Sequence, residues 1–569
     1  MPNTVHRRKS ILAGFIAALA ALLPLAGAAS TTQTLWPEAG MPDAQAGVAA
    51  PYLEGSDAPS APTGACVIIL PGSDYANVGD GAALQPLEAK LLANGVACVW
   101  LRHRPSAAGL PAYQVAWEDG QRAVRLVRQA AAERGYSADK IGVMGFADGA
   151  HLALLLATSS QTAAYAKVDD VDDLACNVNF AIPMSPTRVL TSDTAIDTVF
   201  AFDNKTCTMC LFHGQDDDVT SPIATTRIYR KLRTMTVSNG AKVPSEIHLI
   251  PGRGHAPATA SEFGRAIEFM CQMGFLGPLG AEVPAFDRWA SDEDRATYIK
   301  ENIWPDGQTP DPQDGQVVPF IEWHLPKELK TRAIQIIYAG GAYGFNNHDG
   351  FEVVPTRRYL NEKGMAVVAL KYRTPRPANL AKHMSAWQDL QRAIRLVRAE
   401  APSRGLDPDS IGIMGGSAAG HLTLMGATTS LTPAYARIDD IDDQPCNVKW
   451  AIAFYPAYAL TDGADGTNAN GGNLDTDVLV DDFAFDAKTC KMFFLHGDAD
   501  GYSPMASIKV YSRLHAMHVS CELHVFALRD HDFKSKGATK GKFLGWRPIL
   551  WDWLVQTGLC SDAGATVAR

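Results

Sequence analysis

The chain has 569 residues, of which 47% are hydrophobic and 20% are charged, and its formal net charge is −10 at pH 7. A chain of this length exceeds the usual size of one hydrophobic core and suits two domains of about 250 residues each. The acidic balance argues against nucleic acid or an anionic membrane surface as a partner.

The N-terminus has the three regions of a secretory signal peptide. A basic stretch, MPNTVHRRKS, precedes the apolar run ILAGFIAALAALLPLAGA, and Ala26-Gly27-Ala28 offers a cleavage site of small residues. The apolar run is also long enough to suggest a membrane anchor, but the small residues and the polar TTQT that follow favour cleavage. The sequence therefore predicts a signal peptide at 1–28 and a secreted or periplasmic protein that has no membrane contact after cleavage.

After the signal peptide, the two halves of the sequence repeat the same series of motifs. The segments LWPEAGMPD and AWEDGQRAVRLVR of the first half are answered by IWPDGQTPD and AWQDLQRAIRLVR in the second. Self-similarity over the whole length of each half is typical of a tandem duplication. We predict one domain at 29–280, a linker at 281–300 and a second domain at 301–562, with the two domains packed against each other.

Within each copy, apolar and β-branched runs alternate with helical patterns. In the first copy the runs are CVIIL, VACVWL, KIGVMG, FAIPM, CLFHG and EIHLI, and WEDGQRAVRLVRQAAAERG has helical periodicity. Continuous apolar strands that alternate with helices are typical of a mostly parallel sheet with helices on both faces. The sequence predicts an α/β fold in two tandem domains, with functional residues at the carboxyl ends of the strands.

Two of the ten cysteines recur in both halves, each just before an apolar run. Because an exported protein can form disulfides, each half could close one bridge between neighbouring strands, Cys176–Cys207 in the first and Cys446–Cys490 in the second. Buried free thiols are the alternative interpretation.

In the second copy, the strand-like run SIGIMG leads directly into GSAAGHLTLMGATT. Ser417 thus lies between small residues at a strand-to-helix turn, the arrangement of a nucleophile elbow. The usual pattern is G-x-S-x-G, and here the second glycine is displaced by one position, to Gly420. A serine that merely caps a helix is the alternative.

A serine nucleophile needs a base and an acid that orients the base. Asp500 follows the apolar run MFFLHG, and His531 follows the next run, ELHVFAL. The order Ser417, Asp500, His531 is that of an α/β-hydrolase. Asp498 is a rival for the acid, and His524 lies in mid-strand, where a core position is expected.

An oxyanion hole requires backbone N–H groups beside the nucleophile. Ala418 follows the serine, and Gly341 and Ala342 lie in the early loop IIYAGGAYGFNNHDG, where small residues allow close approach of the backbone. A phosphate-binding loop is a weaker interpretation, because no G-K-S/T follows the glycines.

These motifs resemble the secreted bacterial α/β-hydrolase esterases, in particular the acetylxylan esterase-like and feruloyl esterase-like carbohydrate esterases. The resemblance rests on WP(D/E), the GGAY loop, LKYR, GGSAAGHL, HGDADGYSP and the late His531, and it covers essentially all of each repeat. It implies hydrolysis of acetyl or aromatic acyl esters of polysaccharides or oligosaccharides, through an acyl-enzyme and without a cofactor or metal. It assigns Ser417 as nucleophile, His531 as base, Asp500 as its partner, and Gly341, Ala342 and Ala418 as the oxyanion hole.

The first copy reads as a degenerate esterase. Asp217 and His255 stand where Asp500 and His531 stand in the second copy, but Ala147 replaces the serine. The oxyanion positions hold carboxylates, Asp74 and Asp148, which would repel a developing oxyanion. Packing against the active copy and glycan binding are both possible roles for this half. Convergence of the acidic residues and His255 on a calcium or magnesium ion is an alternative to a decayed pocket.

Two other functions compete with a secreted esterase. An exopeptidase of the prolyl-oligopeptidase kind shares the order of the triad, but the chain has neither a propeller nor a glutamate pair for the peptide amine. A non-catalytic glycan-binding protein is the other, and the intact triad pattern in one copy argues against it.

Overall fold

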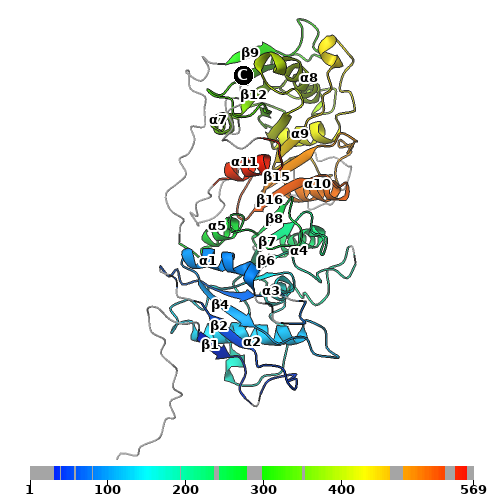
Figure 1. The fold of residues 1–569 in the computed structure, drawn as a ribbon. Coiled ribbons are helices and arrows are strands. Elements are labelled where there is room, and N and C mark those ends of the chain that lie inside the picture. The colour runs from blue at the N-terminus through cyan, green and yellow to red at the C-terminus, as the bar shows by residue number, and fades with distance from the viewer. Residues whose placement is uncertain are drawn as a thin grey trace, which may run out of the picture.

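One mostly parallel β-sheet runs through both halves of the chain (Figure 1). The computed structural model describes residues 31–560, apart from 39, 57, 58, 60, 73, 78, 80, 193, 236–241, 278–297, 349–352, 462–477, 532 and 534–544. The predicted signal peptide at 1–28 and all but three residues of the predicted linker at 281–300 lie outside these residues. Across the described part of the chain, no helix combines the length and apolarity needed to cross a membrane.

The predicted elements form, and equivalent elements recur in both halves in the same order. In the first half these are β1 Thr31–Thr34, β2 Tyr52–Gly55, β3 Cys66–Leu70, α1 Gln85–Ala93, β4 Ala97–Arg102, α2 Gln114–Ala130, β5 Ile141–Phe146, α3 Asp148–Thr158, β6 Phe180–Met184, β7 Thr208–Gly214, α4 Pro222–Thr234, β8 Ser245–Ile250 and α5 Gly264–Gln272. In the second half they are β9 Ile299–Asn302, β10 Phe320–His324, β11 Ile334–Tyr338, α7 Val354–Glu362, β12 Ala366–Lys371, α8 Met384–Glu400, β13 Ile411–Gly416, α9 Ala418–Thr428, β14 Trp450–Phe454, β15 Lys491–Gly497, α10 Met505–Ala516, β16 Cys521–Phe526 and α11 Arg547–Gln556.

The sheet has sixteen strands in the order β1-β2-β4-β3-β5-β6-β7-β8-β16-β15-β14-β13-β11-β12-β10-β9. The second half therefore mirrors the order of the first. Strands pair in parallel from β4 to β8 and from β12 to β16, and β8 joins β16 antiparallel, with His248 opposite His524. The predicted α/β class is confirmed, but the two sheets are continuous. This pairing covers the last strand of each half, which would otherwise present a row of unpaired backbone groups.

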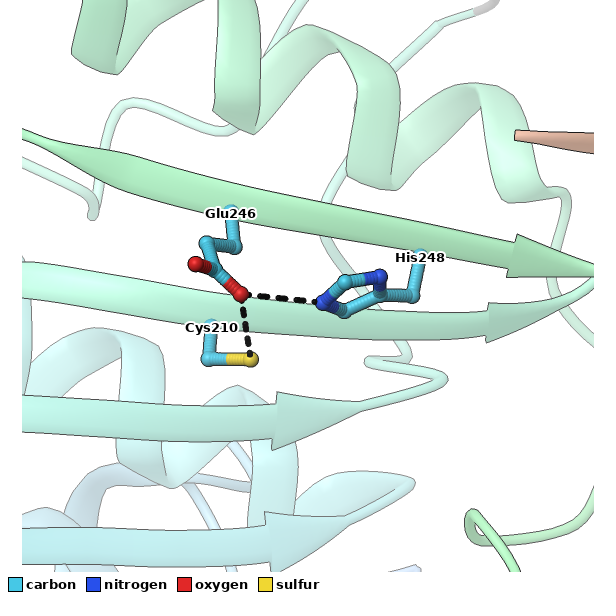
Figure 2. A group of neighbouring side chains, drawn as sticks. All are labelled: Cys210, Glu246 and His248. Carbon is cyan, nitrogen blue, oxygen red and sulfur yellow. Dashed lines mark hydrogen bonds and ion pairs between the residues drawn. The ribbon is translucent and has the colours of Figure 1, made fainter. Parts of the chain in front are cut away.

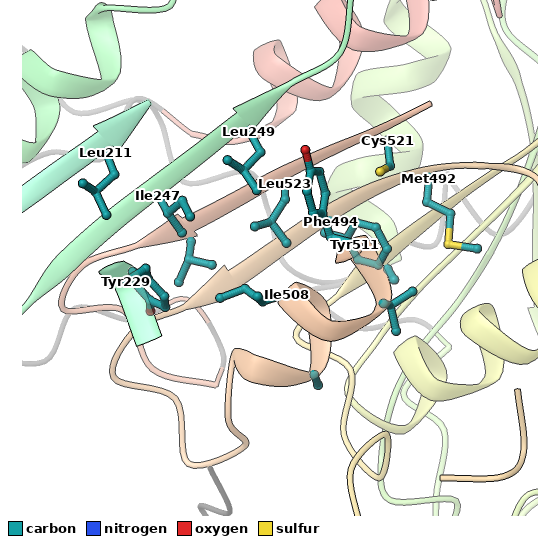
Figure 3. Packing of buried hydrophobic residues seen from close by; sticks show 14 of the residues in the cluster. Leu211, Tyr229, Ile247, Leu249, Met492, Phe494, Ile508, Tyr511, Cys521 and Leu523 are labelled. Atoms are coloured by element: carbon teal, nitrogen blue, oxygen red, sulfur yellow. The ribbon is translucent and has the colours of Figure 1, made fainter. Parts of the chain in front are cut away.

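Helices cover both faces of this sheet. One apolar cluster on the first face includes residues of α2, α3 and α4 and of α8, α9 and α10, so it extends across the junction of the halves. The other face carries two separate clusters. One lies under α1 and α5 and also includes Ala527 of the second half, and the other lies under α7 and α11. Figure 3 shows the shared cluster at the junction, where Ile247 and Leu249 of β8 lie beside Leu523 of β16.

The opposite face of β8 and β16 is polar at the junction. Glu246 Oε2 lies 3.2 Å from His248 Nε2, His248 Nδ1 lies 2.8 Å from His524 Nδ1, and His524 Nε2 lies 2.6 Å from Glu522 Oε1. Burial raises the pKa of both carboxyl groups and lowers that of His248. Figure 2 shows Cys210 of β7 on the same face, with its Sγ 4.0 Å from Glu246 Oε2. The buried side chains of Glu246 and His248 in the first half and of Glu522 and His524 in the second thus connect the halves.

The expected disulfides Cys176–Cys207 and Cys446–Cys490 are wrong, because all ten cysteines are free and buried. The thiols of Cys176 and Cys446 point at carbonyl oxygens of their own loops, 3.3 Å from Ser160 O and 3.2 Å from Ser430 O. Burial raises the pKa of Cys207 and of Cys490, so these thiols stay protonated in the core.

Candidate active site

Ser417 lies at the sharp turn between β13 and α9. Its φ of 59° and ψ of −124° are a backbone conformation that residues with a side chain rarely adopt. Small neighbours are required here: a Cβ on Gly415 would lie 2.7 Å from that of Ala419, and a Cβ on Gly416 would lie 2.8 Å from the ring of Tyr455. The predicted elbow therefore forms for steric reasons that the sequence already indicated.

The three residues of the predicted triad lie within hydrogen-bond distance of one another. His531 Nε2 is 2.8 Å from Ser417 Oγ, and His531 Nδ1 is 3.0 Å from each carboxylate oxygen of Asp500. They come from turns that follow β13, β15 and β16, whose carboxyl ends lie along one edge of the sheet. The geometry allows a proton to pass from the serine to the histidine while the carboxylate holds the ring.

Asp500 is ionised at this site. Burial alone would raise its pKa, but hydrogen bonds from His496 and His531 outweigh burial and lower the pKa to about 2. The backbone N–H of Tyr502 also donates to Asp500 Oδ1 at 2.8 Å. A fixed negative charge beside His531 Nδ1 favours the tautomer that leaves Nε2 free to accept a proton.

Asp498 points away from the triad, into the junction between the halves. Its Oδ1 accepts hydrogen bonds from Tyr229, at 2.5 Å, and from Arg233 Nη1, at 3.0 Å. His524 lies in the polar face of the junction and is buried, as expected for a mid-strand residue. Geometry therefore separates the two candidate acids, since Asp500 alone of the pair contacts His531.

The predicted oxyanion residues lie on two segments that meet at the serine. Gly340 packs so closely on the elbow that a Cβ there would lie 2.9 Å from Ser417 Cβ. Gly341 and Ala342 follow, with φ of 129° and 53°. Ala418 is the first residue of α9, where backbone N–H groups have no acceptor within the helix. Both segments can present N–H groups to an oxygen beside Ser417.

The first half has the same turn and the same histidine–aspartate contact, but alanine stands in place of the serine. Ala147 has φ 54° and ψ −117°, close to the values of Ser417, and His255 Nδ1 lies 2.8 Å from Asp217 Oδ2. Asp74 and Asp148 are both bound by Arg188, whose Nε is 3.2 Å from Asp148 Oδ1.

Arg188 was not identified in the sequence analysis as the partner of these two carboxylates. It offsets the charge of the two carboxylates and occupies them, so the alternative interpretation, convergence of the acidic residues and His255 on a cation, is not seen among the described residues.

Aromatic side chains surround His531, and sequence reasoning missed them as well. The rings of Tyr502 and Tyr455 lie 4.5 and 5.0 Å from that of His531, and Tyr458 lies 6.0 Å from Tyr502. At these positions the first half has Val219, Ser185 and Arg188. Alignment of FYPAYAL with MSPTRVL would have identified Tyr455 and Tyr458, because these tyrosines occur only in the second repeat.

Among the described residues, two groups of side chains bring metal-binding atoms close together. One is the junction group of Cys210, Glu246 and His248, and the other is His383, His421 and Asp482 in the second half.

The family model described as BD-FAE matches residues 58–194 and 321–507, together more than half of the chain. The "Probable carboxylic ester hydrolase LipM" of Mycobacterium tuberculosis is 31% identical over 141 residues, 24% of this chain and 31% of that protein. An "Acetylxylan esterase" of Xylanibacter ruminicola is 29% identical over 140 residues, 24% of this chain and 25% of that protein. The chain thus spans about a quarter to a third of these relatives.

Solved structures of similar fold align with about half of the chain. An acetyl ester-xyloside bifunctional hydrolase from Caldicellulosiruptor lactoaceticus has 23% identity and a TM-score of 0.38, covering 43% of this chain and 97% of that one. Esterase 2 of Thermogutta terrifontis has 22% identity and a TM-score of 0.38, covering 47% of this chain and 96% of that one.

Proposed function

The chain belongs to the BD-FAE family, and on that premise we propose that it is a serine esterase with one working site, in its second half. The observation that carries the proposal is the hydrogen-bonded series Ser417, His531 and Asp500 at the carboxyl edge of the sheet. An unrelated serine at a helix start would not have an imidazole nitrogen at 2.8 Å whose other nitrogen contacts a buried carboxylate.

In the proposed reaction, Ser417 Oγ attacks the carbonyl carbon of the ester while His531 Nε2 takes its proton. The oxyanion accepts hydrogen bonds from the N–H groups of Ala418 and of the loop of Gly341 and Ala342. The carbon–oxygen bond to the alcohol then breaks, and His531 returns the proton to the leaving oxygen. Water attacks the acyl-enzyme by the same route and releases the acid.

The substrate class that we propose is an acetyl or feruloyl ester of a polysaccharide or oligosaccharide. Tyr502, a partly exposed residue whose ring lies 4.5 Å from that of His531, supports it, because an aromatic ring packs well against both sugar faces and aromatic acyl groups. A relative named acetylxylan esterase agrees with this class. Together with the predicted signal peptide at 1–28, it suits an enzyme that acts outside the cytoplasm on plant or algal material.

We further propose that the first half, at 29–280, is non-catalytic and supports the second, at 301–562. It lacks the hydroxyl of an elbow serine, and its last strand pairs with the last strand of the second half. Its contacts reach the turn that carries Asp500, through Asp498.

The test is hydrolysis of p-nitrophenyl acetate and methyl ferulate by the mature protein and three variants. Ser417→Ala and His531→Ala should lose at least a thousandfold in kcat/KM, since each removes a participant in proton transfer. His255→Ala is the matched control in the first half, and it should keep full activity. Turnover that survives in folded Ser417→Ala, or that disappears in His255→Ala, would contradict the proposal.

A further inference from the structure

A second group of polar side chains lies near the serine, in the same half of the chain. His421 lies in α9, four residues after Ser417; His383 directly precedes α8, and Asp482 lies between β14 and β15. Asp482 Oδ2 is 3.1 Å from His421 Nε2 and 3.5 Å from His383 Nδ1, and the three donor atoms all lie within 4.8 Å of one another. We propose that His383, His421 and Asp482 bind a divalent transition-metal ion of the Zn²⁺ class.

A ring nitrogen of His383 that lacks a hydrogen-bond partner points to a ligand. The residue is 6% exposed, and its Nδ1 is buried and makes no hydrogen bond. At 3.5 Å from Asp482, this nitrogen is beyond ordinary hydrogen-bond distance. A buried ring nitrogen without a partner is costly in free energy, and a metal ion in the space that it faces would satisfy it.

The side-chain types of the three groups suit metal binding. His383 and His421 are buried and bring two imidazole nitrogens beside the carboxylate of Asp482. Imidazole nitrogens and carboxylate oxygens are ligands that bind Zn²⁺. Lys382 is the nearby group that opposes a cation.

An outer contact orients one of the proposed ligands. The hydroxyl of Tyr343 lies 2.9 Å from His421 Nδ1, on the side of the ring away from Asp482. When Nδ1–H donates to this hydroxyl, Nε2 carries a lone pair toward Asp482. Histidine ligands of metals are commonly held through their second nitrogen in this way.

Comparison with the equivalent residues of the first half shows which of these contacts are structural. His151 and Tyr75 stand at the positions of His421 and Tyr343 and make the same contact, at 2.8 Å, so that pair alone serves packing in both halves. The other two positions hold Tyr113 and Val199 in the first half, which offer no comparable ligands. His383 and Asp482 thus add two donors only in the half that has the serine.

The donor set and its surroundings indicate the kind of ion. Two imidazoles and one carboxylate suit Zn²⁺ and neighbouring first-row ions better than Ca²⁺ or Mg²⁺, which prefer oxygen ligands. The side chain of Asp482 is 33% exposed, which leaves a side for solvent or another ligand. The ring of Tyr343 stacks on that of Tyr458, 6.2 Å away, and Tyr458 lies beside Tyr502. An ion that holds His421 would therefore also steady Tyr343, next to Ala342.

The test measures metal rather than activity, so it can fail while the proposed esterase stands. Chelator-treated protein is titrated with ZnCl₂ in a calorimeter, and the metal retained after gel filtration is measured by mass spectrometry. We expect one Zn²⁺ per chain. His383→Tyr and Asp482→Val, which introduce the residues of the first half, should each weaken binding at least tenfold while the circular dichroism spectrum stays unchanged.

The control variant is Cys210→Ser, which removes a donor from the junction group and should leave Zn²⁺ binding unaltered. Titration with Co²⁺ gives an independent readout, because a site of nitrogen and oxygen ligands lacks the thiolate charge-transfer band that Cys210 would produce. The proposal is overturned if the chain retains no Zn²⁺, if His383→Tyr binds it unchanged, or if binding is lost in Cys210→Ser. In the first two cases the 3.1 Å contact of His421 with Asp482 is simply a hydrogen bond.

Discussion

Replacement of Arg233 by methionine tests how much the second half, which holds the proposed triad, depends on the first. Arg233 lies near the end of α4 in the first half, and Asp498 lies two residues before Asp500. Their side chains meet at 3.0 Å, and Arg233 Nη1 also donates to the backbone carbonyl of Asp498 at 2.5 Å. The residues are only 3% and 7% exposed, so solvent cannot replace a lost partner.

Removal of one member of a buried ion pair costs about 3–5 kcal/mol, because the remaining charge stays buried without compensation. Tyr229 still donates to Asp498 in the variant, so we expect the lower end, about 3 kcal/mol. The turn that holds Asp500 should shift, and a small misplacement of a catalytic group lowers kcat, here by about tenfold, with little change in KM. Adding Asp498→Asn removes the stranded charge, so the double variant should be more stable than Arg233→Met alone.

Stability is measured by urea denaturation and activity by hydrolysis of p-nitrophenyl acetate. Lys231→Met, an exposed neighbour on the same helix, is the control and should change stability by less than about 0.5 kcal/mol. If Arg233→Met loses stability but keeps its kcat, the first half does not position the acid turn. If it loses neither, or if Asp498→Asn makes it worse, the energetic reasoning about the pair is wrong.

Three further predictions concern the two sites. Ala147→Ser in a Ser417→Ala background should remain inactive toward p-nitrophenyl acetate, since Asp74, Asp148 and Arg188 still fill the oxyanion side; turnover there would refute that explanation. Gly340→Ala should lower kcat about ten- to a hundredfold, because its Cβ would press on Ser417. The control is Gly501→Ala, whose Cβ would meet nothing within 4 Å and which should be neutral. Equal kinetics for the two variants would contradict the close packing of Gly340 on the Ser417 turn. The lowered pKa of Asp500, about 2 against an ordinary 3.8, contributes about 2 kcal/mol of stability that is present above pH 4 and lost as the pH falls toward 2. Asp500→Asn should lack this part of the acid dependence in urea melts at pH 5 and 2.5, and identical acid sensitivity of the two proteins would argue against the shift.

Local patterns predicted much of the candidate site, because its parts are tied to strand ends. The elbow at Ser417 requires small neighbours, and the order of Asp500 and His531 after successive strands follows from a parallel sheet. The resemblance to α/β-hydrolase esterases is confirmed by the family match. The roles of these residues and the domain boundaries stay predictions.

Other parts of the site could not be read in this way. His383, His421 and Asp482 meet because the start of α8, the first turn of α9 and the segment before β15 converge in space, and no local pattern encodes that meeting. Arg188 was missed for the same reason, since its partners Asp74 and Asp148 lie far away in the chain. The disulfides were wrong because strand neighbours need not direct their thiols toward each other.

The sequence by itself determined the α/β class, the repeated order of elements and the presence of a serine at only one of two equivalent turns, because these depend on the order and type of residues along the chain. Tertiary structure alone decided that the halves share one sheet through β8 and β16, and that Asp498 faces Arg233 while Asp500 faces His531. An edge strand has the same alternation of side chains whatever covers it, so its partner is selected by the fit of two folded surfaces.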